Sequence, residues 1–72
     1  MEKLHYWQRL RLRDDICRIK IENLTEEQNW ELQGEVLYKL GFDESDAKYP
    51  NDTYVGNHRL NGWEHALVTS TQ

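Results

Sequence analysis

The residues of this chain that could do covalent or metal chemistry are few. Cys17 is the single cysteine, and the histidines are His5, His58 and His65. A structural zinc site needs four nitrogen or sulfur ligands at a recognisable spacing, and these four residues form no paired motif. Cys17 falls on an apolar face, where a thiol behaves as a small hydrophobe rather than as a nucleophile. We therefore expect no metal, no cofactor and no catalytic site.

The N-terminal part of the chain carries cations near an aromatic side chain, and such residues can bind an anionic partner. Residues 1–20 carry an excess of three positive charges, whereas the remaining 52 residues carry an excess of seven negative charges. Arginine and lysine beside an aromatic side chain can contact phosphates, bases or the acidic surface of a protein. The candidate binding surface consists of Trp7, Arg9, Arg11, Arg13, Arg18 and Lys20.

The elements that would position these cations follow a two-residue repeat, which predicts a β-hairpin over residues 4–21. Asp14 and Asp15 would form its turn, because aspartate tolerates the backbone angles of a two-residue loop. In this register the apolar side chains share one face and the cations share the other. The opposed positions are Leu12 with Cys17, Leu10 with Ile19, Gln8 with Ile21, Arg11 with Arg18, Arg9 with Lys20, and Trp7 with Glu22.

Residues 26–40 are predicted to form a helix. Thr25 and Gln28 have the spacing of a capping box, and Gly41 is typical of the position just past a helix C-terminus. At 100° per residue the apolar side chains form one stripe and the acidic side chains form another. The acidic stripe is an alternative binding surface for a basic partner, and it consists of Glu27, Glu31, Glu35 and Tyr38.

The rest of the chain is predicted to be a loop followed by a hairpin. Residues 43–52 are dense in turn formers, which favours an exposed loop. Asn61 and Gly62 give a strong turn signal within residues 53–69, and β-prone residues flank them, so we prefer a hairpin. The alternative is a short helix that Asn61 would cap. Its inward side chains would be Trp63, Ala66 and Leu67.

These elements predict the α+β fold class, with a single domain over residues 1–72. One helix would pack on the apolar face of an antiparallel sheet that is built from the N-terminal hairpin and a C-terminal strand or hairpin. A chain of 72 residues has a small core, so each large apolar side chain contributes a large share of the stability. The predicted core is Leu10, Leu12, Cys17, Ile19, Trp30, Val36, Leu37 and Leu40.

The charge separation and the missing catalytic residues predict a non-enzymatic protein-interaction module. The single cysteine, Cys17, predicts a reducing, cytoplasmic setting. It would be a regulator or inhibitor of the kind that phages and mobile elements encode. Its partner would be a protein with an acidic or mixed-charge surface, or a second copy joined through the basic and acidic faces. The longest uninterrupted apolar run is far shorter than the ~20 residues of a membrane-spanning helix, so we expect no membrane partner.

Two other interpretations of the basic hairpin face stay open. The face would suit a nucleic-acid-binding domain that uses the hairpin as a basic ribbon. In the simplest interpretation the cations only keep a strand surface hydrated and protect its edge from aggregation. Binding measurements distinguish these interpretations. Replacing the cations should lower the affinity for a partner only if the face is functional.

Overall fold

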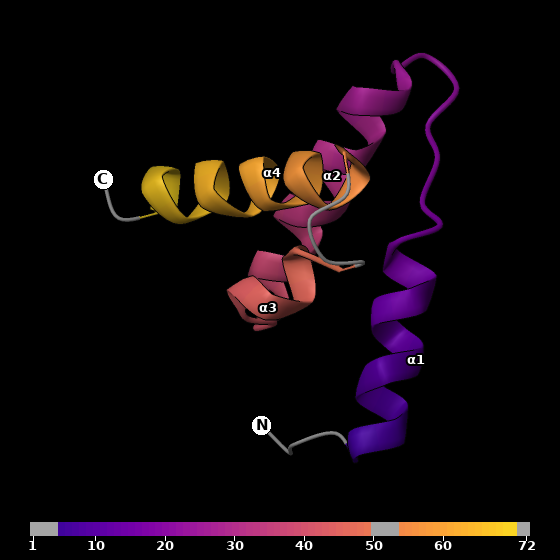
Figure 1. Ribbon diagram of the computed structural model, residues 1–72, viewed down its shortest axis with the longest axis vertical. Helices are drawn as coiled ribbons and strands as arrows, with labels where there is room; N and C mark the ends of the chain where they lie inside the picture. The colour runs from indigo at the N-terminus through magenta and orange to yellow at the C-terminus, as the bar shows by residue number, and fades with distance from the viewer. Residues whose placement is uncertain (1–4, 50–53, 71–72) are drawn as a thin grey trace.

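The computed structural model describes residues 5–49 and 54–70, and these residues form four helices and no strand. The helices are α1 (Tyr6–Ile16), α2 (Glu26–Lys39), α3 (Glu44–Ala47) and α4 (Tyr54–Ser70). Figure 1 shows α2 and α4 crossing at the centre, with α1 along one side and the short α3 below the crossing. The predicted α+β class is therefore wrong, and the described part of the chain is all-helical.

Helix α1 replaces the predicted N-terminal hairpin. Arg9, Leu12, Arg13 and Ile16 are spaced i, i+3, i+4 and i+7, so they share one face of a helix. Two residues of this inward stripe are arginines, whose aliphatic side-chain carbons can cover apolar surface. Leucine and arginine also favour helices, and β-branched residues are missing from α1 until its last position. The strand-like alternation was too short to override these preferences.

Helix α2 confirms the predicted helix and both of its end signals. The Thr25 hydroxyl accepts a hydrogen bond from the backbone N–H of Gln28 (3.1 Å), and the Gln28 side chain accepts one from the backbone N–H of Thr25 (3.0 Å). Gly41 has a φ of 88°, and the N–H of Phe42 donates to the carbonyl oxygen of Leu37. This arrangement is a common helix stop, and it ends α2 one residue before the predicted end.

Helix α4 occupies the region in which we predicted a hairpin, and it begins eight residues before the alternative short helix, whose first residue would be Gly62. Gly62 therefore lies inside a helix rather than in a turn. A Cβ on Gly62 would stand 1.9 Å from the carbonyl oxygen of Glu31, and a Cβ on Gly34 would stand 1.8 Å from that of Arg59. The two glycines let the backbones of α2 and α4 touch, which no residue with a Cβ allows.

The hydrophobic core lies where α1, α2 and the α3 segment meet. Its buried members are Ile16, Leu37, Phe42 and Ala47, and its partly buried members are Leu12, Cys17, Ile19, Val36, Leu60 and Trp63. The prediction was right for Leu12, Cys17, Ile19, Val36 and Leu37. It was wrong for Leu10, Trp30 and Leu40, which lie outside this cluster. Leu40 is 50% exposed because it caps the C-terminus of α2 instead of continuing its apolar stripe.

The segment predicted as a loop over residues 43–52 contains α3. The Asp43 side chain caps this helix by accepting a hydrogen bond from the backbone N–H of Asp46 (3.1 Å). Residues 50–52 of that loop lie outside the described residues, as do residue 4 of the predicted hairpin and residue 53 of the C-terminal one. Helix α3 packs on α2 and α4, buries Ala47 in the core and places Asp46 beside Arg9 and Arg13 of α1.

Candidate interaction surface

The predicted acidic face of α2 is the surface on which α4 packs. The contacts are Glu27 with Tyr54 (3.0 Å), Glu31 with His58 (2.9 Å), Glu35 with His65 (3.4 Å) and Tyr38 with Ser70 (2.8 Å). Residue numbers rise together along both helices, so α2 and α4 run in the same direction. Each residue of this face has a partner within the chain, and we do not propose the face as a docking surface.

One of these contacts shifts the pKa values of both of its groups. A hydrogen bond from its own backbone, and then the bond from the Tyr54 hydroxyl, lower the pKa of the Glu27 carboxyl. The hydrogen bond to Glu27 raises the pKa of Tyr54. At neutral pH the pair is therefore a carboxylate that accepts a hydrogen bond from a phenol. Because the pKa of Glu27 is lowered, its contribution to stability is lost as the pH falls into the acidic range.

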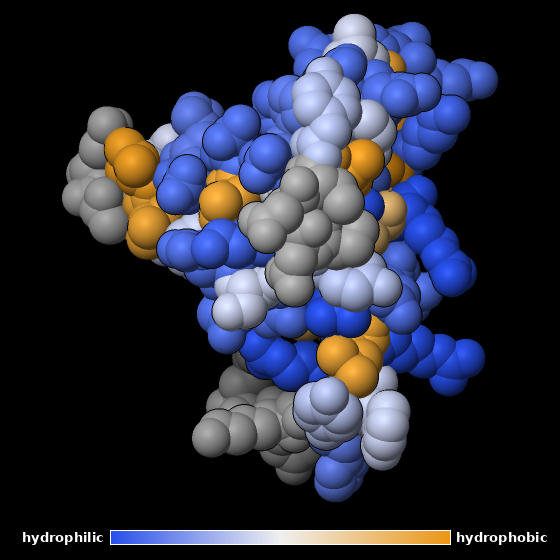
Figure 2. Space-filling view, viewed as in Figure 1, coloured by the Kyte–Doolittle hydropathy of each residue, from blue (hydrophilic) through white to orange (hydrophobic). Residues whose placement is uncertain are grey.

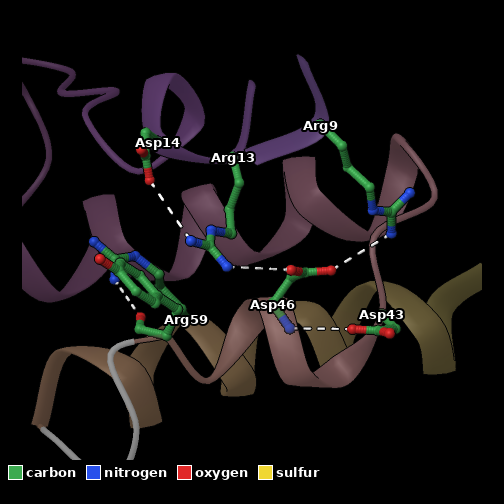
Figure 3. A network of polar contacts seen from close by, with 7 residues as sticks. Arg9, Arg13, Asp14, Asp43, Asp46 and Arg59 are labelled. Atoms are coloured by element: carbon green, nitrogen blue, oxygen red, sulfur yellow. Dashed lines mark hydrogen bonds and ion pairs between the residues drawn. The ribbon is translucent and has the colours of Figure 1, made fainter. Parts of the chain in front are cut away.

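Two of the predicted surface arginines turn toward α3 and hold α1 against it; the Arg13 side chain is 16% exposed and the Arg9 side chain is 41% exposed. Arg9 and Arg13 both contact the carboxylate of Asp46, at 3.5 Å and 3.4 Å, and Figure 3 shows Asp46 between them. The Arg9 guanidinium lies 4.6 Å from the ring centroid of Phe42, and that of Arg13 lies 4.1 Å from the ring centroid of Tyr49. These cation–π contacts and ion pairs occupy both arginines within the fold.

Replacing Asp46 by Asn should loosen α1. The carboxylate is shared by two arginines and is mostly shielded from water, so we expect a loss of about 1–2 kcal/mol, more than an exposed ion pair contributes. Urea unfolding measures this loss, and amide hydrogen exchange should show faster exchange in α1. The matched control is Glu44→Gln, which removes an exposed ion pair to Lys48 and should cost under about 0.5 kcal/mol. Equal losses for both variants would contradict this role of Asp46.

The opposite side of α1 is exposed and has a different composition. Tyr6 is 65% exposed and Trp7 is 77% exposed, and their rings meet edge to face with centroids 5.2 Å apart. Leu10 lies one helical turn beyond Tyr6, and Arg11 lies one turn beyond Trp7. Over the lower part of α1, Figure 2 shows apolar and pale aromatic atoms next to strongly hydrophilic ones. We call these four residues the outer face.

The last two predicted cations, Arg18 and Lys20, lie in the irregular segment after α1. Both side chains are exposed. The backbone of this segment is fixed on α2, because the Gln33 side chain donates to the carbonyl oxygen of Ile19 (2.8 Å) and Asn29 accepts from the N–H of Ile21 (2.6 Å). Within the described residues, no ion pair involves Arg18 or Lys20, and the same holds for Arg11 on the outer face.

Sequence reasoning missed a buried arginine at the centre of the fold. Arg59 is 7% exposed and donates hydrogen bonds to the side chain of Gln33 (2.8 Å) and to the carbonyl oxygens of Tyr49 (2.6 Å) and Cys17 (3.4 Å). No carboxylate of the described residues lies within ion-pair distance of its guanidinium. An arginine in a polar segment gives no periodic signal of burial, so the sequence offers no means of finding this network.

Cys17 lies beside this network but is not activated. Burial raises the pKa of its thiol, and the opposing effects of Arg59 and Arg13 are smaller. A raised pKa means less thiolate at neutral pH, which disfavours nucleophilic chemistry. Among the described residues there is also no group of three or more histidine, cysteine or acidic side chains that could hold a metal ion.

Comparisons of this chain with models of protein families, with curated proteins and with solved structures found no match. None of the described helices is long and apolar enough to cross a membrane. Among the described residues, the outer face of α1 is the most exposed aromatic and basic surface.

Proposed function

We propose that this chain is a small non-catalytic interaction module that binds an acidic protein surface through the outer face of α1. The observation that carries the proposal is the exposed pair of aromatic rings, Tyr6 and Trp7, beside Arg11, a cation that forms no ion pair with any described residue. Tryptophan, tyrosine and arginine are enriched at the centres of protein interfaces. The inward face already attaches α1 to the fold, so stability does not require a tryptophan on the outside.

The distribution of charge supports a protein partner over a nucleic acid. The inward arginines share one aspartate and Arg59 is buried, which leaves Arg11, Arg18, Lys20 and Lys39 as exposed cations without an ion pair in the described chain. The whole chain has a formal net charge of −4. Binding to nucleic acid draws most of its affinity from many phosphate contacts, and four cations offer few. An acidic surface with a pocket for an aromatic ring fits the outer face better.

The proposal extends to a cytoplasmic regulator or inhibitor of a larger assembly, of the kind that phages and mobile elements carry. The free, half-buried thiol of Cys17 supports a reducing compartment. The small size of the chain and the geometry around Cys17 support action by surface complementarity rather than by chemistry. Such a regulator would gain its specificity from the aromatic pair and its charge preference from Arg11.

The proposal is tested by selecting a library of displayed random peptides against the full chain. We expect the selected peptides to combine acidic and apolar residues. Trp7→Ala should weaken peptide binding by about tenfold or more, because truncating an interface anchor commonly costs over 1 kcal/mol. Arg11→Gln should weaken it severalfold and more strongly at low salt. Fluorescence titration with one selected peptide gives both affinities.

Two control variants change similar groups elsewhere. Leu40→Ala shortens another exposed apolar side chain, and Lys39→Gln removes another exposed cation, so neither should alter peptide affinity. Selection of no peptide, or of peptides whose binding survives Trp7→Ala, would overturn the proposal. An oligonucleotide that binds with a steep salt dependence would instead favour the nucleic-acid alternative.

A further inference from the structure

A hollow of about 310 Å³ lies between the segment after α1 and the first turns of α2. Small-molecule sites in proteins begin at about this volume. Its lining combines cations, one carboxylate, amide side chains and an indole ring, namely Arg18, Lys20, Glu26, Asn29, Trp30 and Gln33, together with Cys17 and Ile19. None of these residues belongs to the outer face.

Two cations line the hollow from a wall whose backbone is fixed. Arg18 and Lys20 lie on either side of Ile19, whose side chain packs against the hydrophobic core. The hydrogen bonds from Gln33 and Asn29 hold this part of the chain on α2. A ligand would therefore not have to order the backbone that carries the two cations, which lowers the entropic cost of binding.

The charges that line the hollow favour an anionic group. Arg18 and Lys20 outnumber the single lining carboxylate, Glu26, which leaves an excess of one positive charge. Arg59 lies next to the hollow, because its guanidinium donates to Gln33 and to the carbonyl oxygen of Cys17, which both line the hollow. A phosphate monoester carries about −1.5 to −2 charges at pH 7, so it can pair with both lining cations.

Trp30 provides an apolar aromatic surface at the same hollow. Its ring contacts Tyr54 and His58 of α4, with centroids 5.5 Å and 5.8 Å away, and it also lines the hollow next to α2. An indole that borders open space can stack on a nucleobase or another planar ring. We propose that this hollow binds a phosphate monoester attached to a planar ring, as in a mononucleotide.

Calorimetric titration of the full chain with adenosine 5′-monophosphate, adenosine and inorganic phosphate tests this site. We expect the nucleotide to bind in the submillimolar range, and each of the two fragments to bind at least about fivefold more weakly, since each makes only part of the contacts. The double variant Arg18→Gln/Lys20→Gln should weaken nucleotide binding by about tenfold or more, because two charge-assisted hydrogen bonds are lost. Its melting temperature should match that of the parent, because both side chains are exposed.

The matched control is the double variant Arg11→Gln/Lys39→Gln, which makes the same change in net charge away from the hollow. Its nucleotide affinity should stay within about twofold of the parent value, because the nearby cations act more strongly than distant, screened ones. No nucleotide binding at millimolar concentration would overturn the inference, and so would equal binding of the nucleotide and inorganic phosphate. An equal loss in both double variants would also overturn it, since the effect would then be one of overall charge.

Discussion

Replacing Gly34 or Gly62 by alanine should unfold this protein. The new Cβ would stand 1.8 Å or 1.9 Å from a carbonyl oxygen of the facing helix, and a helix backbone cannot turn aside as a flexible side chain can. Ordinary overpacking of a core costs about 1–3 kcal/mol, and these clashes require α2 and α4 to separate. A domain of this size has only a few kcal/mol of net stability. We expect both variants to lose the cooperative thermal transition measured by circular dichroism.

Asn61→Ala is the control for this experiment, because Asn61 is exposed on α4 directly before Gly62. Alanine is the better helix former by about 0.5 kcal/mol, so the control should be as stable as the parent or slightly more stable. A Gly34→Ala protein that melts cooperatively within about 1 kcal/mol of the parent would show that the two backbones do not touch.

Arg59→Met should produce the second large loss of stability. Methionine keeps an aliphatic stem but leaves three acceptors without their donor, on Gln33, Tyr49 and Cys17. An unsatisfied buried acceptor costs about 1–3 kcal/mol, and removal of a buried, uncompensated cation offsets part of this cost. We therefore expect a net loss of about 2–4 kcal/mol in the free energy of unfolding, measured by urea titration.

Two further variants separate the hydrogen bonds of Arg59 from its charge. Arg59→Lys keeps the cation but has a single donor group, so it should recover only part of the lost stability. Arg11→Met changes an exposed arginine and should leave stability nearly unchanged. If Arg59→Met were as stable as the parent, the burial cost of the cation would equal the value of its hydrogen bonds, and the network would not hold the fold together.

Local signals in the sequence were sufficient to predict α2. Its capping box depends on residues three apart, and its end depends on the backbone freedom of Gly41, so both can be found without knowledge of the tertiary structure. The core residue Leu37 follows from the same helix, because its position in the apolar stripe is fixed by the helical period.

The other two long helices could not be predicted in this way, because their inward faces contain residues that usually indicate an exposed surface or a turn. Arg9 and Arg13 in α1 were interpreted as solvent-facing cations, and Gly62 in α4 was interpreted as a turn residue. Each is explained by a partner distant in the sequence: Asp46 for the arginines and the backbone of Glu31 for the glycine. Tertiary packing overrode the local pattern at these positions.

The candidate site was predicted in part. Trp7 and Arg11 were identified as binding residues from their chemistry, and the structure places both on an exposed surface of α1. The sequence could not separate them from the inward arginines, since a hairpin and a helix divide the same residues between two faces in different ways. The hollow beside Trp30 was not predicted, because it depends on how the segment after α1 lies on α2.

The most direct test of the proposed function is a nuclear magnetic resonance titration of the isotope-labelled full chain with a selected acidic peptide. We expect the largest shifts at the indole N–H of Trp7 and at the amides of the outer face, namely Tyr6, Trp7, Leu10 and Arg11. The amide resonances of α4 should not shift, because its two histidines already contact Glu31 and Glu35 of α2 within the fold. Largest shifts on α4 or around the hollow, with the outer face unchanged, would contradict the claim that α1 is the docking helix.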